Sequence, residues 1–214
     1  MQAGAEPREG REGTQIMKKT RIAALAAVLA FAGATLPASA QTALSEGQIL
    51  QSLQSASRVA PPNLSAALIA NAVQEHIKNN PGMPITWTPL QLLDGLAQIN
   101  VQIQFALNSD IIRPESYSTI GSIADALHHP ILAGYKFVVT GNTDITGDRM
   151  KNLELSQRRA NAVMNALVTV YNVDPARLEA VGLGQENLQD VQNPKDPINR
   201  RVQLINVGKY LPGK

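Results

Sequence analysis

Apolar residues recur at helical spacing over residues 41–98, between polar flanks. Ser45 and Gln48 form a capping-box pattern that predicts the start of one helix. After two prolines, Asn63 is expected to cap a second helix. The apolar stripe expected for it is Leu64, Leu68, Ala72, Val73 and Ile77. A third, short helix is expected from Thr88.

From Ile99 the pattern changes to alternation, which is typical of a half-buried strand. Pro114 then opens a helix with apolar residues on one face, and a strand follows over 136–140. A long helix comes next, and two more strands are expected over 178–181 and 202–207. This β-α-β-α-β-β order predicts an α+β fold with helices packed on one face of a mixed sheet, preceded by a small helical segment.

The chain contains a pattern typical of a secretory signal peptide over residues 17–40. A basic start follows Met17, a mostly apolar stretch runs over 22–36, and Ala38-Ser39-Ala40 resembles a cleavage site. We therefore expect residues 1–16 to be an over-extended start, and we expect the signal peptide to direct export and to be cleaved before Gln41. The alternative is that residues 22–37 stay uncleaved as a membrane anchor.

The net charge of +2 comes from the N-terminal region. Residues 17–40 carry three cationic side chains and residues 1–16 carry a net charge of −1, so the remainder is neutral. With only 4% aromatic residues as well, the composition disfavours nucleic-acid binding. The chain has no cysteine, which excludes disulfides, thiolate chemistry and N-terminal lipidation of a cysteine. The three histidines are scattered, so we expect no metal and no cofactor.

A polar loop from Gly141 to Gly147 leaves a predicted strand and leads into the long helix. Asp144 lies on this loop, and Arg159 lies in the early turns of the helix. An acid and a base are thus expected to converge at one end of the sheet. Such a pair can clamp a zwitterionic amino-acid group, with the carboxylate on the ammonium and the guanidinium fork on the carboxylate.

Simpler interpretations of the same residues exist. Asp144 and Arg159 can form an ordinary surface ion pair with each other, and Asn152 can serve only as a helix cap. Because Arg200 and Arg201 are adjacent in a strand, they are expected to point to opposite faces, with at least one solvated. A calcium loop starting at Asn142 is disfavoured, because Leu153 stands where a bidentate glutamate is needed.

The pattern Gly-x-Thr-Asp-x-x-Gly-x4-Asn-x-x-Leu-Ser-x-x-Arg-Ala-x-x-Val, from Gly141 to Val163, resembles the core of OmpA-like C-terminal domains. Further blocks are similar to that family as well. They are Tyr171-Asn172-Val173-Asp174, Arg177-Leu178, Gly182-x-Gly184 and Asn199-Arg200-Arg201-Val202. The resemblance covers about residues 99–208, which leaves 41–98 as a separate helical segment and 209–214 as a tail.

The resemblance implies non-covalent binding of peptidoglycan through the diaminopimelate of its stem peptide, without catalysis. By motif position, Asp144 would accept the diaminopimelate ammonium and Arg159 would bind its carboxylate. Asn152 and Arg200 would support the pocket, and Asn108 is a looser match. The protein is expected in the periplasm, associated with the cell wall or the outer membrane.

Three positions depart from the family pattern. Asn142 stands where histidine is usual, and Gln185 and Leu188 replace the usual glutamate and proline. These departures lie at loops expected to shape the pocket rim, so they bear on ligand preference rather than on the acid–base pair.

Three alternative functions stay open. In the first, residues 41–98 have apolar stripes that the domain core does not need and dock an envelope partner, so that the chain is an adaptor. In the second, an uncleaved 22–37 segment makes a membrane-anchored, stator-like protein. The weakest is an envelope hydrolase.

Overall fold

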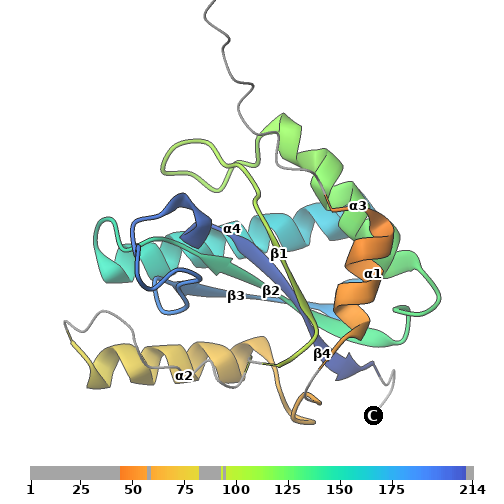
Figure 1. The fold of residues 1–214 in the computed structure, drawn as a ribbon, viewed down its shortest axis with the longest axis horizontal. Helices are drawn as coiled ribbons and strands as arrows, with labels where there is room; N and C mark the ends of the chain where they lie inside the picture. Colours follow the sequence, from red (N-terminus) through yellow and green to blue (C-terminus); the bar gives the residue numbers. More distant parts are fainter. Residues whose placement is uncertain (1–43, 57–58, 82–92, 94, 211–214) are drawn as a thin grey trace, which may run out of the picture. The chain divides into compact units, whose positions relative to one another are not determined.

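The computed structural model describes residues 44–56, 59–81, 93 and 95–210, and residues 41–214 form one compact unit (Figure 1). The expected start, signal peptide, anchor and helix from Thr88 lie outside the described residues. Among the described residues, no helix has both the length and the hydrophobicity needed to cross a bilayer.

Four strands form one mixed sheet in the order β1-β4-β2-β3 (Figure 1). Their bounds are β1 Gln98–Val101, β2 Tyr135–Asn142, β3 Leu178–Gly184 and β4 Val202–Lys209. The helices are α1 Glu46–Gln54, α2 Ala66–Asn79, α3 Tyr117–His128 and α4 Arg149–Thr169, with short 3₁₀ turns η2 Pro114–Ser116, η3 Pro175–Arg177 and η4 Pro197–Asn199. This arrangement confirms the predicted α+β fold class.

The strand directions follow from the connections between them. Strand β4 runs antiparallel to both neighbours, pairing Val202 with Val101 of β1 and Leu204 with Val139 of β2. Strands β2 and β3 are parallel, and α4 is the crossover that a parallel pair requires. Strand β4 extends to Lys209, one residue into the predicted tail.

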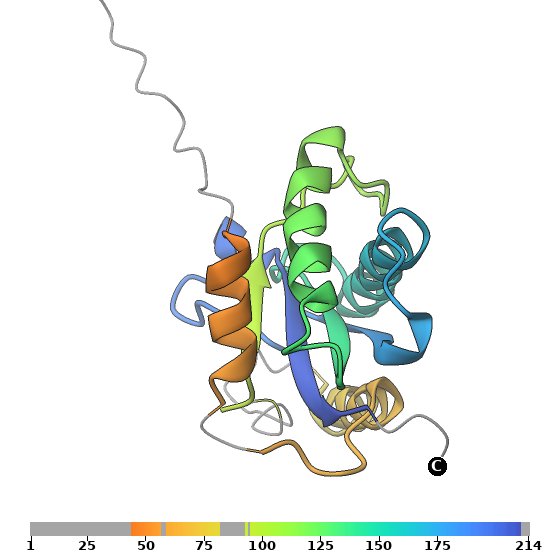
Figure 2. The ribbon, with the colours of Figure 1, turned by 90° about the vertical axis from the view of Figure 1, so that its right-hand side faces the viewer.

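Helices α3 and α4 pack on one face of the mixed sheet, as predicted, whereas α2 of the preceding helical segment covers the other face, which the sequence did not indicate (Figures 1 and 2). Phe137, Val139 and Leu204 share a core with α1, α3 and α4. Val138 and Ile205, which alternate with those residues along the strands, share a second core with α2. The first core dominates the family-like region, whereas the second depends on the segment that precedes it.

The helices before β1 therefore contribute to the domain core. Ile49 and Leu53 of α1 are fully buried in the first core, and Ile69 and Val73 of α2 are buried in the second. The apolar stripes that suggested a free docking surface on residues 41–98 are used inside the domain.

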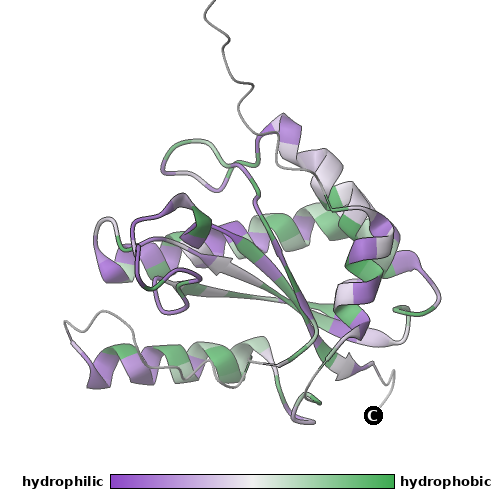
Figure 3. Cartoon of the chain, viewed as in Figure 1, coloured by the Kyte–Doolittle hydropathy of each residue, from purple (hydrophilic) through white to green (hydrophobic). Residues whose placement is uncertain are grey.

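The capping box predicted at Ser45 is present in α1. For α2 the predicted cap is wrong, and the predicted stripe is correct at Val73 but not at Leu68. Ser65, not Asn63, caps α2, and Ile69, Val73 and His76 form its buried stripe. Leu68 is 38% exposed. The chain makes a turn after Pro61, with Leu64 N donating to its carbonyl, so the helix begins later than the sequence suggests. Figure 3 shows hydrophobic and hydrophilic positions alternating along α2, as in an amphipathic helix.

Two motif glycines allow α4 to pack closely on the sheet. A Cβ at Gly141 would collide with the Ser156 carbonyl, and one at Gly182 would collide with the Gln157 backbone. Both strands therefore require glycine where the helix crosses them.

The outer edge of β3 is occupied by side chains from α4. The Gln157 amide donates to the Ala180 carbonyl at 3.2 Å and accepts from Gly182 N at 2.7 Å. The Ser156 hydroxyl accepts from Gly184 N at 2.8 Å. These side chains take the positions that the peptide groups of a further strand would occupy.

Candidate ligand-binding site

A cavity of about 640 Å³ opens at the carboxyl end of β2. It is enclosed by the loop after β1, the loop from β2 to α4, the first turns of α4 and the segment leading into β4. All five residues singled out from the sequence line this cavity: Asn108, Asp144, Asn152, Arg159 and Arg200. The structure thus brings together side chains that are up to 92 positions apart in the chain.

Asp144 lies on the loop after β2 and is 6% exposed. Its Oδ1 accepts from Thr146 N at 2.8 Å, and its Oδ2 is 2.6 Å from Arg200 Nη1. Burial alone would raise the pKa of Asp144, but the hydrogen bonds from Arg200 and Thr146 together hold it below its usual value. The carboxylate is therefore charged at neutral pH.

Among the described residues, the ion partner of Asp144 is Arg200 and not Arg159. The interpretation of Asp144 and Arg159 as a simple mutual ion pair is therefore wrong. The two groups face the same cavity while each is held by different neighbours.

Arg159 extends from α4 into the cavity. Its Nε donates to the Ser109 carbonyl at 3.0 Å, and its guanidinium lies 4.8 Å from the centre of the Phe105 ring. Among the described residues neither terminal nitrogen has a hydrogen-bond partner, so the fork is oriented and available to a ligand. Burial and the nearby charge of Arg200 lower the pKa of Arg159, which still leaves it protonated at neutral pH.

Asn152 holds the loop that carries Asp144. It is the fourth residue of α4, whose cap is Asp148, so the interpretation of Asn152 as a cap is wrong. Its amide nitrogen lies 3.3 Å from the Asp144 carbonyl, 3.2 Å from the Thr146 carbonyl and 3.0 Å from Gln185 Oε1. Its amide therefore fixes the path of the loop at the cavity wall.

Asn108 forms the turn of the loop after β1. Its φ of 50° is left-handed, a conformation that asparagine adopts more readily than most residues. The loop is closed by hydrogen bonds from Ala106 N to the Ile111 carbonyl and from Ser109 N to the Ala106 carbonyl. Asn108 thus sits at the exposed rim of the cavity.

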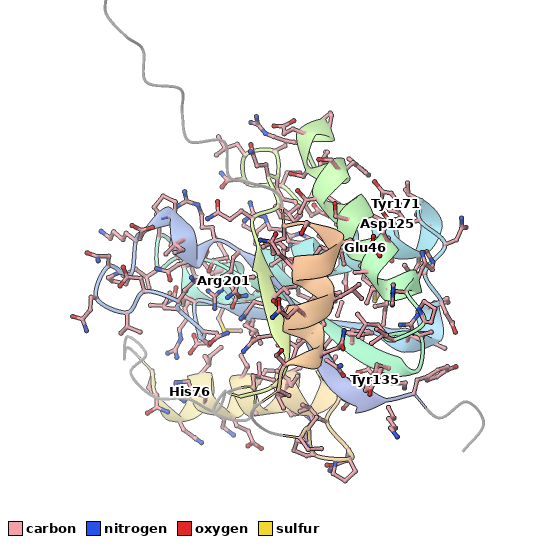
Figure 4. The ribbon with its side chains drawn as sticks, turned by 45° about the vertical axis from the view of Figure 1, so that its right-hand side comes forward. Glu46, His76, Asp125, Tyr135, Tyr171 and Arg201 are labelled. Carbon is pink, nitrogen blue, oxygen red and sulfur yellow. The ribbon has the colours of Figure 1, made fainter. Side chains whose placement is uncertain are left out.

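Arg200 and Arg201 were expected to point to opposite faces of a strand, with at least one of them solvated. Neither is a free solvated charge. The Arg200 side chain is 47% exposed but paired with Asp144. Arg201, labelled in Figure 4, is 6% exposed and donates to Asn100 and Gln203 at 3.3 Å. Burial lowers the pKa of Arg201 to about 10.

Two further cavity residues, Arg113 and Phe105, were missed as site residues. Phe105 was assigned only to a strand, because it continues the alternation of apolar and polar residues. The signal that could have found it is its aromatic ring, which can hold the guanidinium of an arginine. Asn142, expected at a loop, is buried at the end of β2 and donates to Gln203 Oε1 at 3.1 Å.

A model of the OmpA family matches residues 104–201. Outer membrane porin F of Pseudomonas aeruginosa is 31% identical over 110 residues, which cover 50% of this chain and 31% of that protein. Peptidoglycan-associated lipoprotein of Pseudomonas putida is 36% identical over 102 residues, which cover 47% of this chain and 59% of that protein. The chain thus spans about a third of the length of the porin and over half that of the lipoprotein.

Among solved structures, peptidoglycan-associated lipoprotein from Burkholderia pseudomallei aligns with a TM-score of 0.40 at 28% identity, covering 60% of this chain and 97% of that one. The matched residues 104–201 contain the cavity loop after β1, the loop of Asp144, all of α4 and the arginines before β4. Residues 104–201 thus match the model of an OmpA-family domain, and the cavity lies mostly within the matched residues.

Proposed function

We propose that this protein binds peptidoglycan non-covalently in the periplasm and tethers itself to the cell wall. The ligand group is the zwitterionic end of diaminopimelate in the stem peptide. The observation that carries the proposal is the placement of the Asp144 carboxylate and the Arg159 fork in one cavity of an OmpA-family domain. A relative that matches this domain is named as peptidoglycan-associated, which supports the same ligand.

In the proposed complex, Asp144 accepts the ligand ammonium and Arg159 donates to the ligand carboxylate. Arg200 keeps Asp144 ionised and oriented, Asn152 fixes the loop that carries it, and Asn108 lies at the rim. Every one of these roles is binding or positioning, and none requires a bond to be broken.

The charges on the cavity wall favour a ligand with more carboxylates than ammonium groups. Among the described residues, the cavity is lined by one carboxylate, that of Asp144, and by four arginines: Arg113, Arg159, Arg200 and Arg201. We therefore propose that the stem peptide binds best with its carboxylates free, and that amidation of diaminopimelate weakens binding.

Affinity at a single site is expected to be modest. A charge-assisted hydrogen bond contributes roughly 1.5–3 kcal/mol net, and association costs offset much of two or three such bonds, which gives about micromolar to millimolar dissociation constants. A wall with many identical stem peptides lets a released molecule rebind at once, so weak sites suffice for retention.

The test is co-sedimentation of the protein with purified sacculi of the diaminopimelate type, with and without excess free diaminopimelate. We expect the protein to pellet and the free amino acid to release it. A folded protein that stays in the supernatant would contradict the proposal. Release by diaminopimelate but not by 1,5-diaminopentane, which has both ammonium groups and no carboxylate, would sharpen the ligand assignment.

Export rests on the pattern at residues 17–40 and has its own measurement. Mass spectrometry of the protein recovered from cells is expected to find Gln41 at the N-terminus. A mature chain that retains residues 22–37 would instead favour the membrane-anchored alternative.

A further inference from the structure

Helix α2 lies outside the residues that match the OmpA family model, yet charged side chains of the matched region hold both of its ends. At its N-terminus, Ala66 N donates to Glu179 Oε2 at 2.6 Å. At its C-terminus, Arg149 Nη1 donates to the Asn80 carbonyl at 2.6 Å. A carboxylate at the start and a guanidinium at the end both complement the helix dipole.

The C-terminal contact belongs to a buried charge cluster. Arg149 binds Glu186 through two hydrogen bonds, Nε to Oε1 at 2.6 Å and Nη2 to Oε2 at 2.7 Å. Glu186 is 1% exposed, and His76 of α2, labelled in Figure 4, has its Nε2 3.6 Å from Glu186 Oε2. Burial keeps water from competing for these groups, so the cluster fixes its members firmly.

The same cluster borders the loop that carries Asp144. Arg149 is the first residue of α4, directly after that loop. Gln185, the neighbour of Glu186, accepts from the Asn152 amide, which also binds the Asp144 and Thr146 carbonyls. The two segments that position the loop, the start of α4 and residues 185–186, are therefore joined by one ion pair.

We propose that Arg149 and Glu186 are positioning residues: their ion pair, which also holds the C-terminal end of α2, fixes the loop of Asp144 and with it the geometry of the ligand cavity. The identity of the ligand rests on the proposed function, whereas the positioning role of the ion pair does not. The C-terminal end of α2 is thereby coupled to the binding site, although the described residues of α2 do not line the cavity.

The test compares two matched substitutions, Glu186→Gln and Glu179→Gln. Each removes one carboxylate that holds an end of α2, but only Glu186 is joined to the Asp144 loop. We expect Glu186→Gln to weaken retention on sacculi about fivefold or more, because a loosened loop misplaces a charged hydrogen-bond partner. Glu179→Gln is expected to lower the melting temperature while leaving retention within about twofold of the unsubstituted protein.

A measurement without ligand separates this inference from the proposed function. In amide NMR spectra, Glu186→Gln should shift the signals of Thr143 to Gly147, whereas Glu179→Gln should shift signals near the start of α2 alone. Equal effects of both variants on the loop, or no effect of Glu186→Gln, would overturn the inference even if the protein binds sacculi. If the protein does not bind sacculi, the proposed function fails while the spectra still decide the positioning role.

If Glu186→Gln does not fold, Arg149→Lys serves as the second variant. Lysine keeps the positive charge but cannot make the paired bonds to Glu186 and the bond to Asn80 together. The loop signals should then shift in the same direction, and unchanged loop signals in this variant would overturn the inference.

Discussion

Each end of the sheet holds an arginine beside an aromatic ring, Arg177 buried and Arg159 half-buried, and the two guanidiniums differ in how many partners the protein supplies. At the end where β2 and β3 begin, Arg177 donates to the carbonyls of Tyr135, Leu127 and Leu132 at 2.7–3.1 Å and lies 5.7 Å from the Phe137 ring. At the cavity end, Arg159 donates one hydrogen bond to the described residues, from its Nε to the Ser109 carbonyl.

The difference separates a structural arginine from one available to a ligand. Each of the three nitrogens of Arg177 donates to a carbonyl, which joins the end of α3 to the start of the strands and leaves no nitrogen without a protein partner. Arg159 is held by its inner nitrogen and by Phe105, which leaves its outer nitrogens directed to the cavity. Burial alone therefore does not distinguish the two arginines, whereas the number of nitrogens that the protein satisfies does.

The largest effect is expected from Arg177→Ala. Because this substitution removes a buried guanidinium and its three hydrogen bonds to carbonyls, it should reduce the free energy of unfolding by about 3 kcal/mol. Urea denaturation measures the loss. Retention on sacculi should be unchanged when it is measured without urea, where the variant is still folded. Loss of retention by the folded variant would contradict the assignment of Arg177 to stability rather than binding.

Arg159→Ala is expected to act in the opposite way. Loss of the fork should weaken retention on sacculi by about tenfold or more, with a change in unfolding free energy below about 1 kcal/mol. Arg159→Lys is the matched control, since it keeps the charge without the planar fork and should bind weakly. Retention equal to that of the unsubstituted protein would remove Arg159 from the proposed site.

A smaller effect, with a defined pH dependence, is expected from Asp144→Asn. Because the pKa of Asp144 is lowered in the folded protein, its charge contributes stability above the unfolded carboxyl pKa of about 3.9. This contribution is lost as the pH falls through the lower folded value. The stability difference between the two proteins should thus be constant from neutral pH to about pH 4 and shrink below it.

Thermal unfolding of both proteins across this pH range measures that difference. A difference that already changes between pH 7 and pH 5 would show that another group is responsible. At neutral pH, Asp144→Asn should also weaken retention several-fold, because a neutral amide replaces the carboxylate proposed to meet the ligand ammonium.

The smallest effect is expected from Phe105→Leu. The ring contributes about 0.5–1 kcal/mol to holding the Arg159 guanidinium, so retention should fall only about two- to fivefold. Phe137→Leu, beside Arg177, is the matched control and should affect stability rather than retention. A tenfold loss with Phe105→Leu would indicate that the ring contacts the ligand directly.

The sequence predicted the strands and helices after residue 99 because alternation there is regular and glycines mark the ends. It also predicted that Asp144 and Arg159 lie at the same end of the sheet, where both line the cavity, because the loop leads directly into the helix that carries Arg159. The partner of Asp144 was not predictable, since Arg200 lies 56 positions away and only the folded sheet brings it close.

The errors before residue 99 have a different cause. Capping residues are frequent around α2, so the pattern allowed Asn63 as well as Ser65. The expected stripe included Val73 but placed Leu68 instead of its neighbour Ile69 on the buried face. The sequence also did not indicate which face of the sheet α2 covers. Val138 and Ile205, which share a core with α2, lie in strands whose apolar runs do not distinguish the two faces.

The position of Gln157 at the edge of β3 protects the sheet against pairing with a second copy of the chain. An unpaired edge strand is a template on which a second chain can add its own strand, and such addition can continue into aggregates. Here one glutamine amide binds both the Ala180 carbonyl and the Gly182 N–H. A neighbouring copy therefore finds these edge positions already taken, and the sheet ends within a single molecule.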